Sequence, residues 1–204
     1  MVKSTGTGTG GQAMRLIGVI PSVILGVLAL MLPGGTFAQT WSEYVSGQDR
    51  FHIVFPGEPQ VEEVEWISAD GLRVPARRYS AEQGDNHYSI TVIDYEGARL
   101  GTMLGSMAHA ATAFRQKGDV TIDAYAQLDR IGGHQLQITE PDGRLLYVAI
   151  YLHDNFLYVT EASVPLTSPR GTIFQHSLSI TDENGIRVRY NRDGTRNFER
   201  QLGD

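Results

Sequence analysis

Hydrophobic and polar residues alternate over most of the chain from residue 51 onward, and this period of two is the feature that most constrains the fold. Successive side chains of a β-strand point to opposite faces, so such alternation indicates strands with one buried face. The first four runs, each followed by turn-forming residues, cover 51–55, 61–68, 72–81 and 88–95. We predict that these strands pair as antiparallel neighbours through short turns.

The period then changes to that of a helix. Apolar residues recur every three or four positions between residues 100 and 118, at Leu100, Leu104, Met107, Ala111 and Phe114. This spacing places them on one helical face, so we predict a helix over about 101–117, ended by Gly118. A second, shorter helix is predicted over 168–179.

Strands resume between the two predicted helices, over 120–128, 134–140, 145–152 and 156–164. The run 145–152 is apolar on both faces and must therefore be covered on both sides. The fold class predicted is α+β, a mainly antiparallel sheet flanked by helices in an α/β/α sandwich. The side chains expected in its core are Phe51, Phe55, Met107, Phe114, Leu146, Val148, Ile150, Leu157, Val159 and Phe174.

The beginning of the chain predicts export. Residues 16–32 form a nearly uninterrupted apolar run after Lys3 and Arg15, with small residues following, so residues 1–38 match a signal peptide. Cleavage is expected between Ala38 and Gln39, and the alternative is an uncleaved membrane anchor. Translation from Met14 would also leave a cationic start. Periplasmic or secreted localisation follows from either start.

Residues 39–181 are expected to form one domain, and 182–204 a polar segment with an edge strand near 186–190 and then a loose tail. Residues 39–204 hold 15 basic against 23 acidic residues, a formal charge of −8, which argues against nucleic acid or an anionic membrane as partner. The chain has no Cys, which excludes disulfides, thiol catalysis and cysteine metal sites.

Two short stretches carry a resemblance to a known group. WSEY at 41–44 with FHIVFPGEP at 51–59 resembles the opening of small exported bacterial domains of the PsbP/Mog1-like fold group, and FQHSL at 174–178 is similar to their closing helix. The resemblance implies an antiparallel sheet between helices. It also implies accessory or regulatory roles, as in photosystem subunits, a GTPase regulator and envelope proteins. The matching positions look structural, so no functional residue is carried over.

No catalytic, cofactor or metal-binding signature stands out in the sequence. The glycine-rich stretch at 6–11 follows no strand, which excludes a dinucleotide loop. No two of the six histidines share a helical face at metal-binding spacing. Asp94, Glu96 and Asp123 could gather around a divalent cation if their strands were neighbours. His153, Asp154 and Asn155 fit an ordinary turn better than an acid–base site.

The sequence therefore favours a non-enzymatic exported domain that binds another envelope protein, with no catalytic residue or cofactor assigned and the oligomeric state left open. A contiguous patch of exposed tyrosines would mark the partner surface. The alternative is a small-molecule or divalent-metal-binding module, which includes a hydrolase whose site is assembled from dispersed His and Asp residues. That alternative predicts a pocket in which at least two of His52, His87, His134 and His153 converge with a carboxylate.

Overall fold

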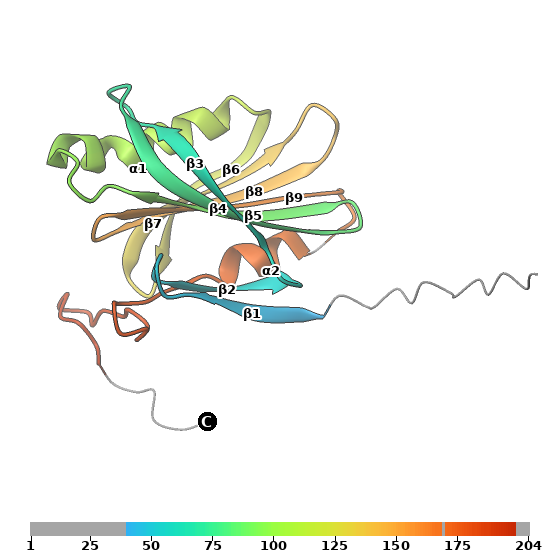
Figure 1. Cartoon of the computed structure of the whole chain (residues 1–204). Coiled ribbons are helices and arrows are strands. Elements are labelled where there is room, and N and C mark those ends of the chain that lie inside the picture. The colour runs from blue at the N-terminus through green and yellow to red at the C-terminus, as the bar shows by residue number, and fades with distance from the viewer. Residues whose placement is uncertain (1–39, 169, 199–204) are drawn as a thin grey trace, which may run out of the picture. The chain divides into compact units, whose positions relative to one another are not determined.

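The central layer of the computed structural model, which describes residues 40–168 and 170–198, is a seven-stranded sheet (Figure 1). Its spatial order is β3-β4-β5-β9-β8-β7-β6, and every pairing is antiparallel. The strands are β3 Gln60–Ile67, β4 Arg73–Gln83, β5 Asn86–Asp94, β6 Asp119–Leu128, β7 Ile131–Thr139, β8 Leu145–His153 and β9 Phe156–Val164. The run predicted to be covered on both faces is β8, which lies inside the sheet between β7 and β9.

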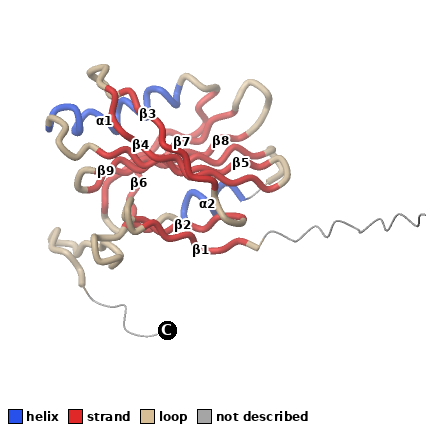
Figure 2. The backbone as a smooth tube through the Cα atoms, in the orientation of Figure 1, coloured by secondary structure: helices blue, strands red, loops and turns tan. Residues whose placement is uncertain are grey.

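Helix α1, Leu100–Arg115, packs on one face of this sheet (Figure 2). Ala110, Ala111 and Phe114 are buried there against apolar side chains of β7, β8 and β9. Part of the predicted helix face is wrong, because Leu100 and Leu104 are each 64% exposed. Thr102 and Ser106 are buried in their place, and the Thr102 hydroxyl donates to Asp70 Oδ2 at 2.6 Å. Because Thr102 bonds the β3–β4 turn, the first turns of α1 direct polar rather than apolar side chains toward the protein.

The other face is covered by a smaller sheet and a short helix. The strands of the small sheet are β1 Trp41–Ser46, β2 Phe51–Pro56 and β10 Ser179–Ile180, and the helix is α2, Arg170–His176. The predicted pairing of β2 with β3 is therefore wrong: β2 pairs with β1 and β10. Gly57, with a φ of 101°, follows β2 where the chain passes from one layer to the other. The α+β class is confirmed, with a three-stranded sheet beside α2 on this second face.

The predicted core residues are buried, apart from Met107, which is half-buried. They divide into two clusters, one on each face of the central sheet. Phe51, Phe55 and Phe174 pack between the sheet and the small layer, whereas Phe114 packs under α1. Aromatic contacts such as that of Phe51 with Tyr79 on β4, 5.0 Å between ring centroids, join the small layer to the central sheet.

A buried polar network also ties the small sheet to the large one. Asp49, in the β1–β2 turn, is completely buried, and its carboxylate accepts hydrogen bonds from both ends of the Arg77 guanidinium fork on β4. The Tyr79 hydroxyl donates to Asp49 Oδ2 at 2.5 Å, and it also contacts the Ser46 hydroxyl at 3.1 Å. Burial, reinforced by the hydrogen bond to Asp49, raises the pKa of Tyr79 to about 12. The hairpin is thus fixed by charge as well as by apolar packing.

Residues 181–198, where the sequence predicts an edge strand near 186–190 and the beginning of a loose tail, form a tandem of two nine-residue hairpin units; residues 199–204 of that tail lie outside the described residues. Three backbone hydrogen bonds of the first unit each recur in the second unit nine residues later. The bond from Asp182 N to Ile186 O matches that from Asn191 N to Thr195 O, and the bond from Gly185 N to Asp182 O matches that from Gly194 N to Asn191 O. The bond from Val188 N to Ile180 O matches that from Asn197 N to Arg189 O. The two glycines have φ values of 77° and 80°, which favour glycine.

Each hairpin unit carries an arginine that bonds an aspartate outside its own turn. Arg187 Nε donates to Asp129 Oδ2 in the β6–β7 turn at 2.5 Å, and Arg196 Nη2 donates to Asp182 Oδ2 in the first unit at 2.7 Å. Val188 between them is completely buried in the core. The first unit is therefore docked on the domain, and Arg196 holds the second unit to the first.

The predicted signal peptide, residues 1–38, lies outside the described residues. Within the described part of the chain, neither helix has the length and apolar character needed to cross a bilayer.

Candidate functional site

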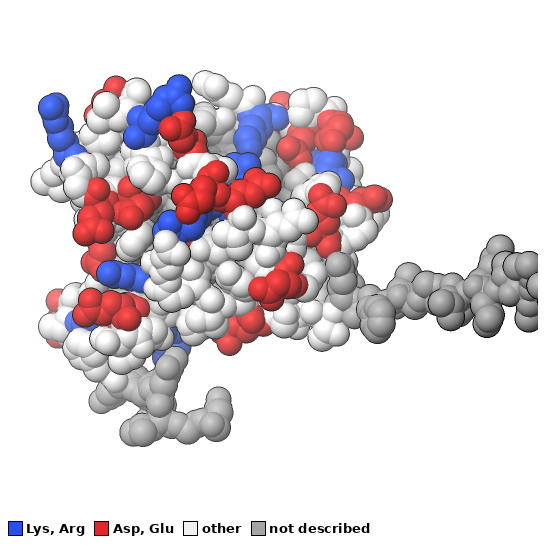
Figure 3. All heavy atoms as spheres, viewed as in Figure 1, with Lys and Arg blue, Asp and Glu red and all other residues white. Residues whose placement is uncertain are grey.

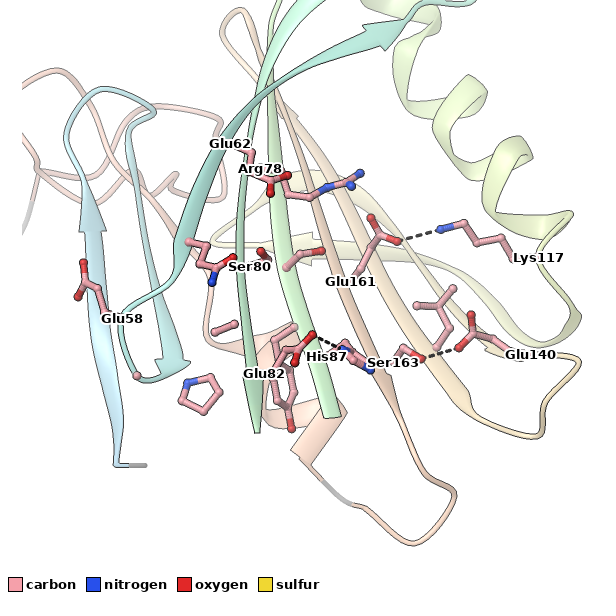
Figure 4. A pocket seen from close by; sticks show the side chains of 17 residues that line it. Glu58, Glu62, Arg78, Ser80, Glu82, His87, Lys117, Glu140, Glu161 and Ser163 are labelled. Carbon is pink, nitrogen blue, oxygen red and sulfur yellow. Dashed lines mark hydrogen bonds and ion pairs between the residues drawn. The ribbon is translucent and has the colours of Figure 1, made fainter. Parts of the chain in front are cut away.

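Helix α1 covers only part of its face of the central sheet, and the uncovered part is polar. Beyond the end of the helix lies a cavity of about 670 Å³ on this face (Figure 4). We call it the polar recess. It is lined mainly by charged and hydroxyl side chains of β3, β4, β5 and β9 with the segments next to them: Gln60, Glu62, Arg78, Ser80, Glu82, His87, Ser89, Lys117, Glu140, Glu161 and Ser163.

The recess exists because strand β4 changes character along its length. Val74 and Ala76 point toward α1 and are buried, whereas Arg78, Ser80 and Glu82 continue the same face without cover. Neighbouring strands change at the same level, so polar side chains meet across the sheet. The apolar core under α1 therefore gives way to a solvated floor.

A row of polar side chains crosses the floor of the recess. Gln60, Ser80, Ser89 and Glu161 are directly opposite one another on β3, β4, β5 and β9. Within the described residues, the side chains of Gln60, Ser80 and Ser89 have no hydrogen-bond partner in the protein. Their donors and acceptors are thus available to a bound molecule.

One wall of the recess already holds an ammonium group. Lys117 Nζ lies 2.9 Å from Glu161 Oε2, and it also lies 4.3 Å from the centroid of the Phe114 ring. The Glu161 side chain is 19% exposed and that of Lys117 is 44% exposed. A carboxylate and the face of an aromatic ring together form a favourable binding site for a cation.

Ser163 and Glu140 form the next part of the wall. The Ser163 hydroxyl donates to Glu140 Oε2 at 2.5 Å and accepts from Arg144 Nε at 2.9 Å. Arg144 also donates to the Ser163 carbonyl, at 2.6 Å, which fixes the guanidinium behind the recess. On the neighbouring strand, His87 Nδ1 lies 3.1 Å from Glu82 Oε1.

The charge of the recess is negative overall. Five carboxylates line it, from Glu58, Glu62, Glu82, Glu140 and Glu161, against the two fixed cations of Arg78 and Lys117. Arg78 is exposed, and its Nε donates to Thr91 Oγ1 at 3.3 Å. Among the described residues, neither Arg78 nor Glu62 takes part in an ion pair, although the two residues are opposite each other on β4 and β3.

The four histidines named by the sequence do not converge. His52 contacts Glu43, His87 contacts Glu82, His134 contacts Asp123, and His153 contacts Asp154 and the Tyr190 hydroxyl, so each has its own carboxylate. The shared histidine pocket predicted for the alternative function is thus not formed. Only His87 lines the polar recess.

The proposed gathering of acids around a cation is also wrong. Asp94 and Glu96 lie at the end of β5, whereas Asp123 is on β6, and β9, β8 and β7 separate the two strands. Asp123 instead accepts from Arg115 Nε at 2.7 Å and contacts His134. These two hydrogen bonds, that of Arg115 first, lower the Asp123 pKa to about 2. Among the described residues no group of three His, Asp or Glu side chains is placed to hold a metal ion.

The tyrosines do not form the exposed patch considered from the sequence, because Tyr125 alone among them is largely exposed. Tyr79, Tyr88, Tyr95, Tyr151 and Tyr158 are buried, and Tyr125 on β6 is exposed at the opposite edge of the sheet from the recess. Acidic and basic side chains are interspersed over the face of the molecule shown in Figure 3. Sequence reasoning missed the recess, whose signal was the change from apolar to polar residues at alternate positions of β4.

Comparison with known proteins gives one kind of match. No protein-family model matches the chain, and no curated protein matches its sequence. Among solved structures it is similar to the cyanobacterial PsbP (CyanoP) of Synechocystis sp. PCC 6803, with a TM-score of 0.47 and 14% identity over 72% of this chain and 96% of that chain. We take no residue role from this neighbour.

Proposed function

We propose that this protein is an exported, non-enzymatic accessory domain that binds a segment of another envelope protein in the polar recess. The observation that carries the proposal is the row of Gln60, Ser80 and Ser89, whose side chains lie unengaged on the floor of a cavity. A buried face at this position would call for apolar residues, as under α1. Polar side chains held open in a cavity instead suit a hydrogen-bonding occupant.

Site-specific photocrosslinking in intact cells tests the proposal. A benzoylphenylalanine at position 60 is on the recess face of β3, and one at position 61 is on the opposite face, where Val61 is 49% exposed. We expect an adduct with an envelope protein from position 60 and none from the neighbouring control. Equal adducts from both positions, or none from position 60, would contradict binding in the recess.

A hydrolase is the second candidate function, and one observation favours it. His87 is directly opposite Ser163 on the neighbouring strand, and its Nδ1 contacts Glu82, so the three side chains have the order of a nucleophile, a base and an orienting acid. However, the Ser163 hydroxyl donates to Glu140 and not to His87. Labelling of wild type, but not of Ser163→Ala, by a fluorophosphonate probe would establish the hydrolase and reject the non-enzymatic proposal.

A further inference from the structure

We infer that the segment bound in the polar recess is basic: an extended stretch of the partner protein that carries lysine or arginine side chains. This inference rests on the proposed function and names the chemistry of the occupant. It follows from three features of the recess, namely its charge balance, the ammonium that it already holds, and the row of hydrogen-bonding groups on its floor.

The charge balance disfavours an anionic occupant. Five glutamates face two fixed cations, and one of those cations, Lys117, is already paired with Glu161. Within the described residues no lysine or arginine forms an ion pair with Glu58, Glu62, Glu82 or Glu140. An acidic occupant would meet like charges around most of the recess, whereas a basic one would complement them.

Lys117 shows how the recess accepts a cation. Its ammonium lies between the Glu161 carboxylate, at 2.9 Å, and the face of the Phe114 ring, at 4.3 Å. This arrangement belongs to the protein itself, and it shows that an alkylammonium group is compatible with the shape of the wall. A lysine ammonium from a partner would meet the other recess carboxylates, those of Glu58, Glu62, Glu82 and Glu140, which form no ion pair with a lysine or arginine of the described residues.

The floor suits an extended main chain. Gln60, Ser80, Ser89 and Glu161 are on four adjacent strands, so the row spans three strand spacings, about 14 Å. An extended segment of roughly four residues, at about 3.3 Å each, covers that length. Amide and hydroxyl groups can bond its peptide groups while the glutamates on either side of the row receive its basic side chains. The acids alone would not define this occupant; the cavity and its neutral polar floor do.

Fluorescence anisotropy with the full-length chain tests the inference. The probes are labelled five-residue peptides, acetylated and amidated, that alternate serine with lysine, glutamate or glutamine. Unlabelled spermidine serves as a competitor that has the charge without the peptide. We expect binding of the lysine peptide alone, weakened by added salt.

A charge-matched pair of variants locates the binding. Glu62→Gln with Glu82→Gln removes two charges from the recess, and Glu63→Gln with Glu65→Gln removes two from the opposite face of β3. We expect the first variant to weaken lysine-peptide binding about 2- to 30-fold and the second less than 2-fold. Arg78→Gln removes a repelling charge, so it should tighten binding.

Four outcomes would overturn the inference. These are no binding of the lysine peptide, binding of the glutamate peptide, equal weakening by both variants, or displacement of the labelled lysine peptide by spermidine at the concentration at which the unlabelled lysine peptide displaces it. If an adduct still forms from position 60 in these cases, the partner-binding function stands and only the basic character of the segment is rejected. If no adduct forms, the proposed function falls as well.

Discussion

Replacing Asp49 with asparagine should destabilise the domain far more than removing an exposed charge. The Asp49 carboxylate is completely buried and bonds the Arg77 guanidinium, which is 17% exposed, as well as the Tyr79 hydroxyl. Breaking a buried ion pair leaves an uncompensated charge and costs about 3–5 kcal/mol. Glu63 Oε1, 3.9 Å from Arg77, partly compensates that charge, so we expect the low end of the range, about 3 kcal/mol.

Thermal and urea unfolding of the two proteins measure this difference. For a domain of this size about 3 kcal/mol corresponds to a fall in Tm of roughly 6–12 °C. Glu65→Gln is the matched control, because it removes an ion pair to Arg73 whose side chains are 60% and 72% exposed, and it should cost less than about 1 kcal/mol. Adding Arg77→Met to Asp49→Asn should recover part of the loss. Equal effects of Asp49→Asn and Glu65→Gln would refute the role of the network in joining the two sheets.

Three further predictions concern a glycine pair, a histidine and the N-terminus. Gly105→Ala in the middle of α1 should raise the free energy of unfolding by about 0.5–1 kcal/mol. Gly133→Ala should lower it by about 1–3 kcal/mol, because the new Cβ would lie 2.6 Å from the Ile150 carbonyl oxygen. Urea unfolding midpoints measure both changes, and a change of the same sign in both variants would contradict the packing. Burial lowers the pKa of His153 from its ordinary 6.5, and the nearby Asp154 carboxylate opposes this shift. As pH drops from 6.5, the unfolded state therefore binds more protons than the folded state, and the free energy of unfolding falls. His153→Gln should flatten this dependence in urea titrations at pH 7.5 and 5, and an unchanged slope would exclude His153 as its source. Terminal sequencing of the envelope-fraction protein should read from Gln39; a start at Met1 or Met14 would favour the uncleaved anchor.

Local pattern was enough to predict two helices and eight of the strands, though not β1 or β10, but the partner strands of each element depended on long-range contacts. The alternation of Phe51, Ile53 and Phe55 correctly indicated one buried face for β2. It carried no information about which sheet the strand joins, because any apolar layer satisfies that face. Pairing of β2 with β10 depends on residues more than a hundred positions later in the chain.

The candidate site shows the same division. On β4 the alternation of Tyr79 with Arg78 and Ser80 indicates an ordinary strand with one solvated face. Only the register places Ser80 beside Gln60 and Ser89, and only the end of α1 at Arg115 leaves this part of the sheet uncovered. The recess is therefore a property of tertiary arrangement, with no contiguous motif to reveal it.

The two hairpin units give the C-terminal segment a repeat length of nine residues. Because three backbone hydrogen bonds repeat every nine residues, removal of residues 188–196 would carry Asn197 into the place of the buried Val188 and keep the backbone spacing, while the contact of Arg196 with Asp182 would be lost. A deletion of five residues would instead bring every later donor opposite the wrong acceptor. Loss of a whole unit therefore keeps the backbone pattern at the cost of one core side chain, whereas a change of intermediate length disrupts the backbone pattern as well.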